Sequence, residues 1–209
     1  MTRSTRERIL EEALRLFAER GYAATSVAEI EAAAGLSPGA GGLYRHFRSK
    51  YEVLAAAVNE RAVRAEARIA AMGAADPALP VGERLTRLCG AGLAGVGEES
   101  ELILVFFRDL GRFPELVEVV RAGLLQPMFD AVGSWLLSQP EYGGADLDPS
   151  AVGAVLGGAL VHHLLFEETV GEPPGRAGRD RFVASWVSLA LGLLPMANGC
   201  PREPELSQT

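Results

Sequence analysis

Cysteine and long apolar runs are scarce in this sequence. Its 209 residues include two cysteines, Cys89 and Cys200, which are too few for a disulfide framework and lack the spacing of metal ligands. No apolar run reaches the roughly 18 to 20 residues that a membrane span needs, and residues 1–8 are polar and basic. We therefore expect a cytoplasmic protein with no membrane segment, no bound metal and no cofactor.

The alternating pattern of β-strands is also almost absent. A 3.6-residue apolar period recurs along most of the chain instead, as is typical of amphipathic helices. The 48% hydrophobic content is enough to build a buried core. The pattern predicts an all-α fold of about nine helices. We expect them at residues 6–20, 27–34, 37–47, 49–72, 82–97, 100–110, 114–138, 149–170 and 178–194. Pro127 should kink the helix at 114–138.

Three capping boxes locate helix starts near the N-terminus. In Ser4-x-x-Glu7, Ser26-x-x-Glu29 and Ser49-x-x-Glu52, the serine and the glutamate can each satisfy a backbone N–H of the first turn. Further along, a stretch rich in glycine and proline interrupts the helical pattern. We expect an N-terminal head at residues 1–50, a linking helix at 49–72, a body at 73–197 and a frayed tail at 198–209.

The charge is unevenly distributed along the chain. The formal net charge of −7 argues on its own against a nucleic-acid partner. However, residues 1–68 contain 11 Lys or Arg and 9 Asp or Glu, whereas residues 69–209 contain 9 and 18. A mildly basic head on an acidic body indicates two functions in one chain.

The second and third predicted helices are joined by a tight turn at residues 34–36. Gly35 permits a left-handed turn, and the alanines before it allow two helices to approach closely. This arrangement is that of a helix-turn-helix, in which the first helix lies across the DNA backbone and the second enters the major groove. An ordinary helical hairpin would show the same bare pattern.

The residues around the turn are more specific. The segments Leu16-Phe17-Ala18-Glu19-Arg20-Gly21-Tyr22, Ala34-Gly35-Leu36-Ser37 and Leu43-Tyr44-Arg45-His46-Phe47-x-Ser49-Lys50 occur in this order, and together they resemble the TetR family of transcriptional regulators. The resemblance is strong over residues 6–58 and only architectural beyond them. It implies a DNA-binding head, a helical ligand-binding body, a homodimer built from the last two long helices, and phosphate contacts by Tyr44 and Lys50.

Two features depart from the family pattern. Six residues separate Ser37 from Tyr44, two more than the family usually has, and three of them are glycines that weaken a helix. Glu31 stands where the family commonly has a small residue. Either Glu31 faces solvent or the local packing differs.

Candidate DNA contacts cluster near the turn and the helix starts. Thr25, Ser26, Tyr44 and Lys50 are expected at phosphates, Arg3 and Arg6 along the backbone or in the minor groove, and Ser37 to Gly41 or Arg45 at base edges. Few of these side chains donate in a planar fork, so shape should contribute to recognition. The full set is Arg3, Arg6, Thr25, Ser26, Ser37, Pro38, Gly39, Ala40, Gly41, Tyr44, Arg45, His46 and Lys50.

The body carries candidates for an effector cavity. The segment 102–107 is apolar on all sides, so its helix should be central. A largely apolar cavity could be lined by Phe106, Phe107, Met128, Trp135, His162, His163 and Phe166. Ordinary core packing is the alternative for each of them, and His163 with Glu167 lacks a third metal ligand.

The dimer interface is expected on the last two long helices. Small residues would let helices pack closely there, beside larger apolar ones. The candidates are Gly153, Gly157, Val161, Phe182, Trp186 and Leu189, and packing inside one protomer is the alternative.

The glycines at residues 90–95 match a dinucleotide-binding pattern, but no strand precedes them. We therefore expect no enzyme. The sequence favours a dimeric repressor that binds a palindromic operator in double-stranded DNA and is released by a small, largely apolar effector. Two alternatives stay open: an activator of the same fold, and a helical small-molecule binding protein or enzyme with a vestigial head.

Overall fold

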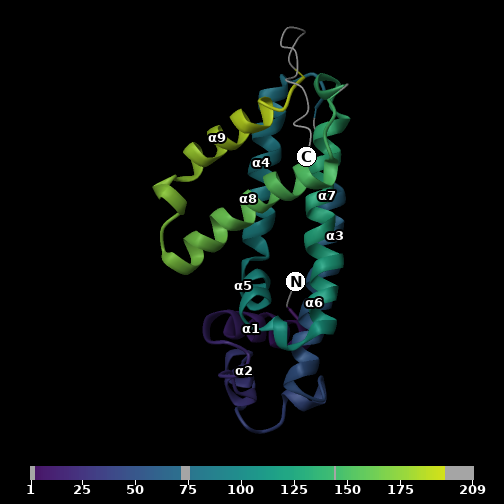
Figure 1. Ribbon diagram of the computed structural model, residues 1–209. Coiled ribbons are helices and arrows are strands. Elements are labelled where there is room, and N and C mark those ends of the chain that lie inside the picture. Colours follow the sequence, from purple (N-terminus) through teal and green to yellow (C-terminus); the bar gives the residue numbers. More distant parts are fainter. Residues whose placement is uncertain (1–2, 72–75, 144, 196–209) are drawn as a thin grey trace, which may run out of the picture.

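The computed structural model describes residues 3–71, 76–143 and 145–195. Within these ranges the chain is all-α, as expected, with nine α-helices (Figure 1). Their bounds are α1 Thr5–Arg20, α2 Val27–Ala33, α3 Lys50–Ala71, α4 Val81–Glu98, α5 Ser100–Arg108, α6 Pro114–Val120, α7 Gln126–Ser138, α8 Pro149–Val170 and α9 Arg179–Leu191. The expected tail at 198–209 lies outside the described residues.

The head lies at one end of an elongated molecule, and α8 and α9 lie toward the other end (Figure 1). The long helix α3 starts in the head and runs along the body. Because α1 packs against α5 as well as α3, the head contacts the body in addition to the chain connection through α3.

Two of the three predicted capping boxes are complete. In α1 and α2 the serine hydroxyl accepts from the glutamate N–H, and the glutamate carboxylate accepts from the serine N–H. These hydrogen bonds lower the pKa of Glu7 and of Glu29. The third box is only half formed, because the Glu52 carboxylate accepts from Arg48 N–H instead.

The buried apolar side chains form two clusters. The first contains Phe17, Ile30 and Leu54 from the head region together with Leu102 and Leu116 from the body. The second lies wholly in the body, around α4, α7, α8 and α9. Because the first cluster extends from the head into the body, a shift of α5 or α6 should change the packing of side chains in the head.

The predicted kink at Pro127 takes the form of a π-helical turn. Residues Arg121–Leu125 form one wide turn between α6 and α7, in which Gln126 N–H donates to the carbonyl of Arg121. Proline has no N–H to continue the regular ladder, so a locally wider turn just before it relieves the mismatch.

Helix α8 crosses α7 at very short range. A Cβ on Gly153 would lie 2.0 Å from the carbonyl oxygen of Phe129, and one on Gly133 would lie 1.9 Å from that of Pro149. Only glycine fits at either position. α8 is also long and apolar enough, by composition alone, to pass for a membrane span, with a mean hydropathy of 1.4 over its most apolar stretch, of which a third is buried. Its packing against α7 and α4 accounts for part of that apolar character.

Candidate functional site

The third predicted helix, at residues 37–47, is not formed. Residues 38–42 make turns, and only Leu43–Arg45 forms a single 3-10 turn. Gly39 and Gly41 have φ angles of +73° and +76°, in the left-handed region that interrupts a right-handed helix. The prediction of a third helix at residues 37–47 was therefore wrong.

Glu31 explains how this irregular segment is held. Its side chain is 0% exposed, and its carboxylate accepts hydrogen bonds from Gly39 N–H at 2.7 Å and from Leu43 N–H at 2.9 Å. No ion pair to Glu31 is present among the described side chains, so these N–H groups are its direct partners. The sequence left open whether Glu31 faces solvent or the local packing differs from the family pattern. The second is the case, because Glu31 points inward.

The segment at residues 37–46 presents most of its predicted DNA-contacting residues on the surface. Tyr44 is 57% exposed, Gly41 is half-buried, and the remaining exposed members are Ser37, Pro38, Gly39, Ala40, Arg45 and His46. Arg48 is exposed beside them and was missed, although its position among Arg45, His46 and Lys50 could have indicated it.

Two predicted phosphate contacts near the start of α2, Thr25 and Ser26, form hydrogen bonds within the head instead. The hydroxyl of Thr25 is buried and hydrogen-bonds to the carbonyls of Leu16 and Gly21. Thr25 is therefore a packing residue, and its prediction as a phosphate contact was wrong. Ser26 is exposed, but its hydroxyl caps α2 and donates to Glu29 at 2.7 Å.

The side chain of Lys50 hydrogen-bonds to backbone carbonyls of the head. Its Nζ donates to the carbonyls of Tyr22 and Thr25, both at 2.7 Å, and lies 4.4 Å from the centroid of the Tyr22 ring. Burial lowers the pKa of Lys50, while Asp109 and Glu29 oppose the shift. The ammonium has a third N–H, so a phosphate contact by Lys50 stays a prediction.

Arg3 and Arg6 both form ion pairs with glutamates of the head region. Arg3 pairs with Glu11 at 2.7 Å, and Arg6 pairs with Glu60 while its guanidinium lies 5.4 Å from the Phe47 ring centroid. Both side chains stay partly exposed, so their contact with DNA would require exchange of these partners.

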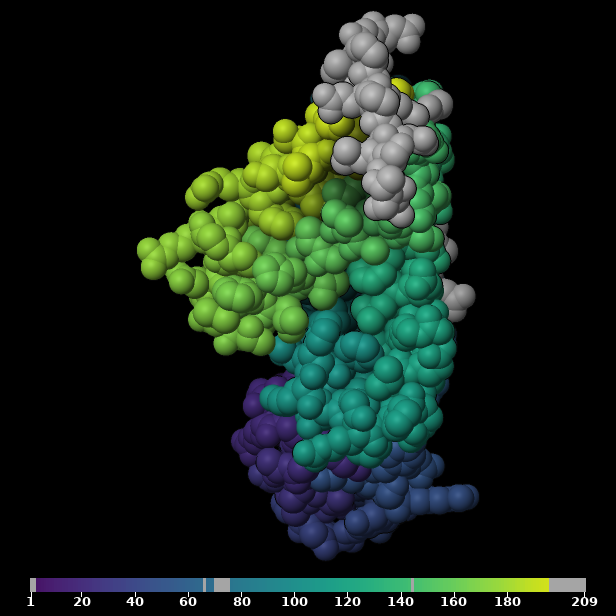
Figure 2. Space-filling model, viewed as in Figure 1, coloured from purple at the N-terminus to yellow at the C-terminus, as the bar shows by residue number. Residues whose placement is uncertain are grey.

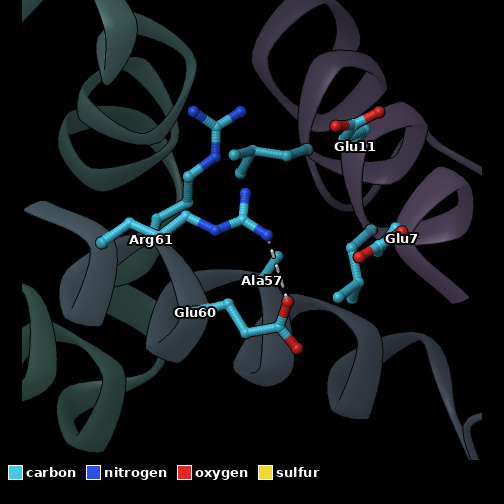
Figure 3. A pocket seen from close by; sticks show the side chains of 8 residues that line it. Glu7, Glu11, Ala57, Glu60 and Arg61 are labelled. Carbon is cyan, nitrogen blue, oxygen red and sulfur yellow. Dashed lines mark ion pairs between the residues drawn. The ribbon is translucent and has the colours of Figure 1, made fainter. Parts of the chain in front are cut away.

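A cleft of about 310 Å³ lies beside these pairs, between α1 and α3. Figure 3 shows Glu7 and Glu11 on one side and Glu60 and Arg61 on the other. Arg64 also lines it and pairs with Glu60 at 3.8 Å. Because charges of both signs line this cleft and several are already paired, we assign it no ligand.

The predicted effector residues do not form one cavity. Phe107 is 60% exposed, Phe166 and His162 are also exposed, and Phe106 is half-buried against the first apolar cluster. Trp135 and His163 are buried, the latter stacked on Phe182 with ring centroids 4.1 Å apart. Aromatic side chains signal burial or contact, and the sequence could not show which surface each one meets.

A different set of residues encloses a cavity of about 490 Å³, its open mouth included. Of the predicted residues, only Met128 lines it. Its polar groups are Arg68 from α3 and Glu99 at the junction of α4 and α5. Most other walls are apolar side chains, among them Ile69, Val96, Ile103, Leu124 and Leu160.

Four of the predicted dimer residues are instead packed inside the protomer. Gly153 and Gly157 contact Phe129, Val161 is buried, and Trp186 donates to the Leu156 carbonyl at 2.9 Å. Phe182 covers His163. Of the predicted set, Leu189 is exposed.

The exposed apolar side chains of α8 and α9 lie elsewhere on the two helices. Val155 is 71% and Leu189 68% exposed, and both line an apolar groove with Ala151, Val152, Leu156 and Leu193. α8 and α9 form a lobe that projects from the body (Figure 2), and the groove lies at the start of α8 and the end of α9.

The comparison with known proteins agrees with the architecture of the head. Residues 9–57 match the family model of bacterial regulatory proteins of the tetR family. The head is therefore that of a TetR-family transcriptional regulator. Over 52 residues it is 46% identical to the uncharacterized HTH-type transcriptional regulator YerO of Bacillus subtilis (strain 168), a match that spans 25% of this chain and 17% of that relative.

Solved structures extend the likeness in fold to the body. A TetR-like transcriptional regulator from Rhodococcus sp. RHA1 has a TM-score of 0.65 at 24% identity and covers 91% of this chain and 96% of its own. FadR from Bacillus subtilis in complex with stearoyl-CoA has a TM-score of 0.63 at 18% identity, covering 90% and 97%. At these identities the comparisons establish a shared fold.

Proposed function

We propose that this TetR-family chain is a dimeric repressor that binds a palindromic operator through its head and leaves it when a small molecule occupies the body. The observation that carries the proposal is the exposed surface made by residues 37–41, Tyr44, Arg45 and His46 at the outer end of the head. A polar and basic surface in that position suits the edge of a DNA groove.

In this proposal the turn at residues 37–41, which Glu31 anchors, recognises the DNA bases. Residues 37–41 carry few side chains that hydrogen-bond in a fork, but the left-handed glycines bring backbone groups to the surface. Arg45 is the exposed side chain of this surface that can pair bidentately with a guanine. Tyr44 and Arg48 would contact phosphates and fix the register of the turn.

The apolar surface of α8 and α9 supports a homodimer. Val155 and Leu189 face solvent in one protomer, and two copies of this groove placed face to face would remove both from water. The heads of such a dimer would contact half-sites about 34 to 36 Å apart.

Helix α5 supplies a connection between the cavity and the head. Its N-terminal end carries Ile103 and adjoins Glu99 at the cavity. At its other end Arg108 Nη2 donates to the Phe17 carbonyl, and the carboxylate of Asp109 accepts from Tyr22 N–H at 3.0 Å. A ligand that prefers a shifted α5 would therefore bias the position of the head.

The proposal is tested on a DNA duplex enriched from a random-sequence pool by the wild-type protein. Arg45→Ala should weaken binding to that duplex by about tenfold to a hundredfold, because a bidentate base contact contributes about 1–3 kcal/mol. Arg87→Ala, which removes an exposed arginine from α4, serves as the matched control. Equal affinities of the two variants would refute the assignment of the surface.

The dimer is tested separately by size-exclusion chromatography with light scattering. Val155→Arg should convert the protein to a monomer, whereas Val63→Arg, at a similarly exposed valine of α3, should leave the dimer intact. If Val155→Arg stays dimeric, the interface lies elsewhere. A protein that binds small molecules but no duplex would support the alternative of a vestigial head.

A further inference from the structure

The cavity between α3, α4, α5 and α7 contains a carboxylate oxygen without a hydrogen bond. Glu99 is 2% exposed and lines the cavity. Its Oε1 accepts from Arg68 Nη2 at 2.5 Å, but its Oε2 has no hydrogen-bond partner among the residues that the structure describes. A buried, unsatisfied carboxylate oxygen is costly, so this position is suited to a donor that comes from outside the chain.

The neighbouring arginines do not supply that donor. Arg61 Nη1 lies 3.7 Å from Glu99 Oε2, and it donates to the Glu98 carbonyl at 2.8 Å. Its Nη2 lies toward Glu101, at 3.5 Å. Arg68 uses its two terminal nitrogens on Glu98 and on Glu99 Oε1. Each guanidinium therefore already donates to other acceptors, and within the described part of the chain none of them hydrogen-bonds to Glu99 Oε2.

The charge around Glu99 indicates the sign of the ligand. This cluster of ion pairs contains two positive charges, on Arg61 and Arg68, and three negative charges, on Glu98, Glu99 and Glu101. It therefore has an excess of one negative charge. A protonated amine would bring the cluster to neutrality, whereas a carboxylate or phosphate would add to the excess in a poorly solvated place.

The rest of the cavity indicates an apolar remainder. Its walls are aliphatic side chains such as Val96, Ile103 and Leu124. Gly95 contributes open space, because a Cβ on it would meet nothing within 4 Å.

We propose that the effector is a largely apolar molecule with a protonated amine, held by a charge-assisted hydrogen bond from its ammonium to Glu99 Oε2. The inference rests on the proposed function, since it names the chemical class of the molecule that empties the operator. It separates this chain from the FadR relative of similar fold, whose solved complex contains stearoyl-CoA, an anionic thioester.

Isothermal titration calorimetry with three probes of equal chain length tests the ligand class. Decylamine should bind the wild type at least about tenfold tighter than decanol, and decanoate should bind most weakly, because a hydrogen bond to a charged group is stronger than a neutral one. If decanol or decanoate binds as tightly as decylamine, or if decylamine does not bind, the proposal is overturned.

Two variants test the place of binding. Glu99→Gln should lose about tenfold in decylamine affinity and keep its affinity for decanol within about twofold. Gly95→Leu should abolish binding of both by filling the cavity. Gly97→Leu, at an exposed position of the same helix, should change neither. Because both leucine variants improve helix propensity, they keep the test valid even if Glu99→Gln does not fold. Unchanged decylamine binding in Gly95→Leu would overturn the assignment.

The same probes distinguish failure of this inference from failure of the proposed function. Decylamine should release the wild-type protein from its selected duplex, and release should be lost in Gly95→Leu. A wild type that binds DNA but neither binds decylamine nor is released by it refutes the ligand class alone. A wild type that binds decylamine but no duplex refutes the repressor.

Discussion

Replacing Glu31 with glutamine tests how the head holds the segment that we propose reads DNA. The two side chains have nearly the same shape, so packing around the fully buried position is preserved. The carboxylate offers two acceptor oxygens to Gly39 N–H and Leu43 N–H, whereas the amide offers one oxygen and one donor group. One of the two backbone N–H groups then faces another donor.

The expected loss of stability follows from these two hydrogen bonds. A hydrogen bond to a charged group contributes about 1.5–3 kcal/mol and a neutral one about 1 kcal/mol, and a buried N–H without a partner costs about 1–3 kcal/mol. Removing a buried negative charge offsets part of this loss. We expect a net destabilisation of about 2 kcal/mol, which lowers the unfolding midpoint of a chain of this size by about 4–8 °C.

Thermal unfolding followed by circular dichroism, at equal protein concentrations, measures this shift. Glu83→Gln makes the same change at an exposed glutamate in the first turn of α4 and should leave the midpoint within about 1 °C. DNA affinity should also fall in Glu31→Gln, because the turn loses its anchor. A variant that melts with the wild type and binds DNA equally would refute the role of Glu31.

The crossing of α7 and α8 and the buried histidine give two further predictions. Gly153→Ala should destabilise the protein by about 1–3 kcal/mol, because its Cβ would lie 2.0 Å from a backbone oxygen. Gly97→Ala, whose Cβ would meet nothing within 4 Å, should not destabilise it. Equal unfolding midpoints for the two variants would contradict the tight crossing. Burial lowers the pKa of His163 below its ordinary 6.5, with Glu167 opposing the shift, so the unfolded chain binds more protons and stability falls as the pH drops through about 6.5. His163→Phe should remove that part of the acid sensitivity in melts between about pH 5 and 7, and an unchanged pH dependence would contradict the assignment.

The regular helices could be predicted from the sequence because their signals are local. Serine caps and a 3.6-residue apolar period placed α1, α2, α4 and α8 within two residues of their ends. The segment at 37–47 could not be predicted in this way. Its shape depends on a carboxylate eight residues before Gly39 that turns inward, and nothing in the sequence alone distinguishes that from a solvent-facing glutamate.

Residues of the body site were harder to predict for a related reason. Small residues occur on several faces of α8, and the sequence does not say which face meets α7 and which stays exposed. Gly153 and Gly157 meet α7 at close range, while Val155 between them is exposed. Glu99 had no local signal at all, because its partners Arg61 and Arg68 come from a distant helix.

Selection of duplexes from a random-sequence pool, followed by fluorescence anisotropy in a salt series from about 50 to 200 mM, tests the central claim most directly. We predict an enriched inverted repeat with half-sites about one helical turn apart, bound by two protomers. Its affinity should fall steeply with salt while exceeding that for a scrambled duplex throughout. No enrichment, with no salt-dependent binding to either duplex, would contradict the account of this chain as a DNA-binding repressor.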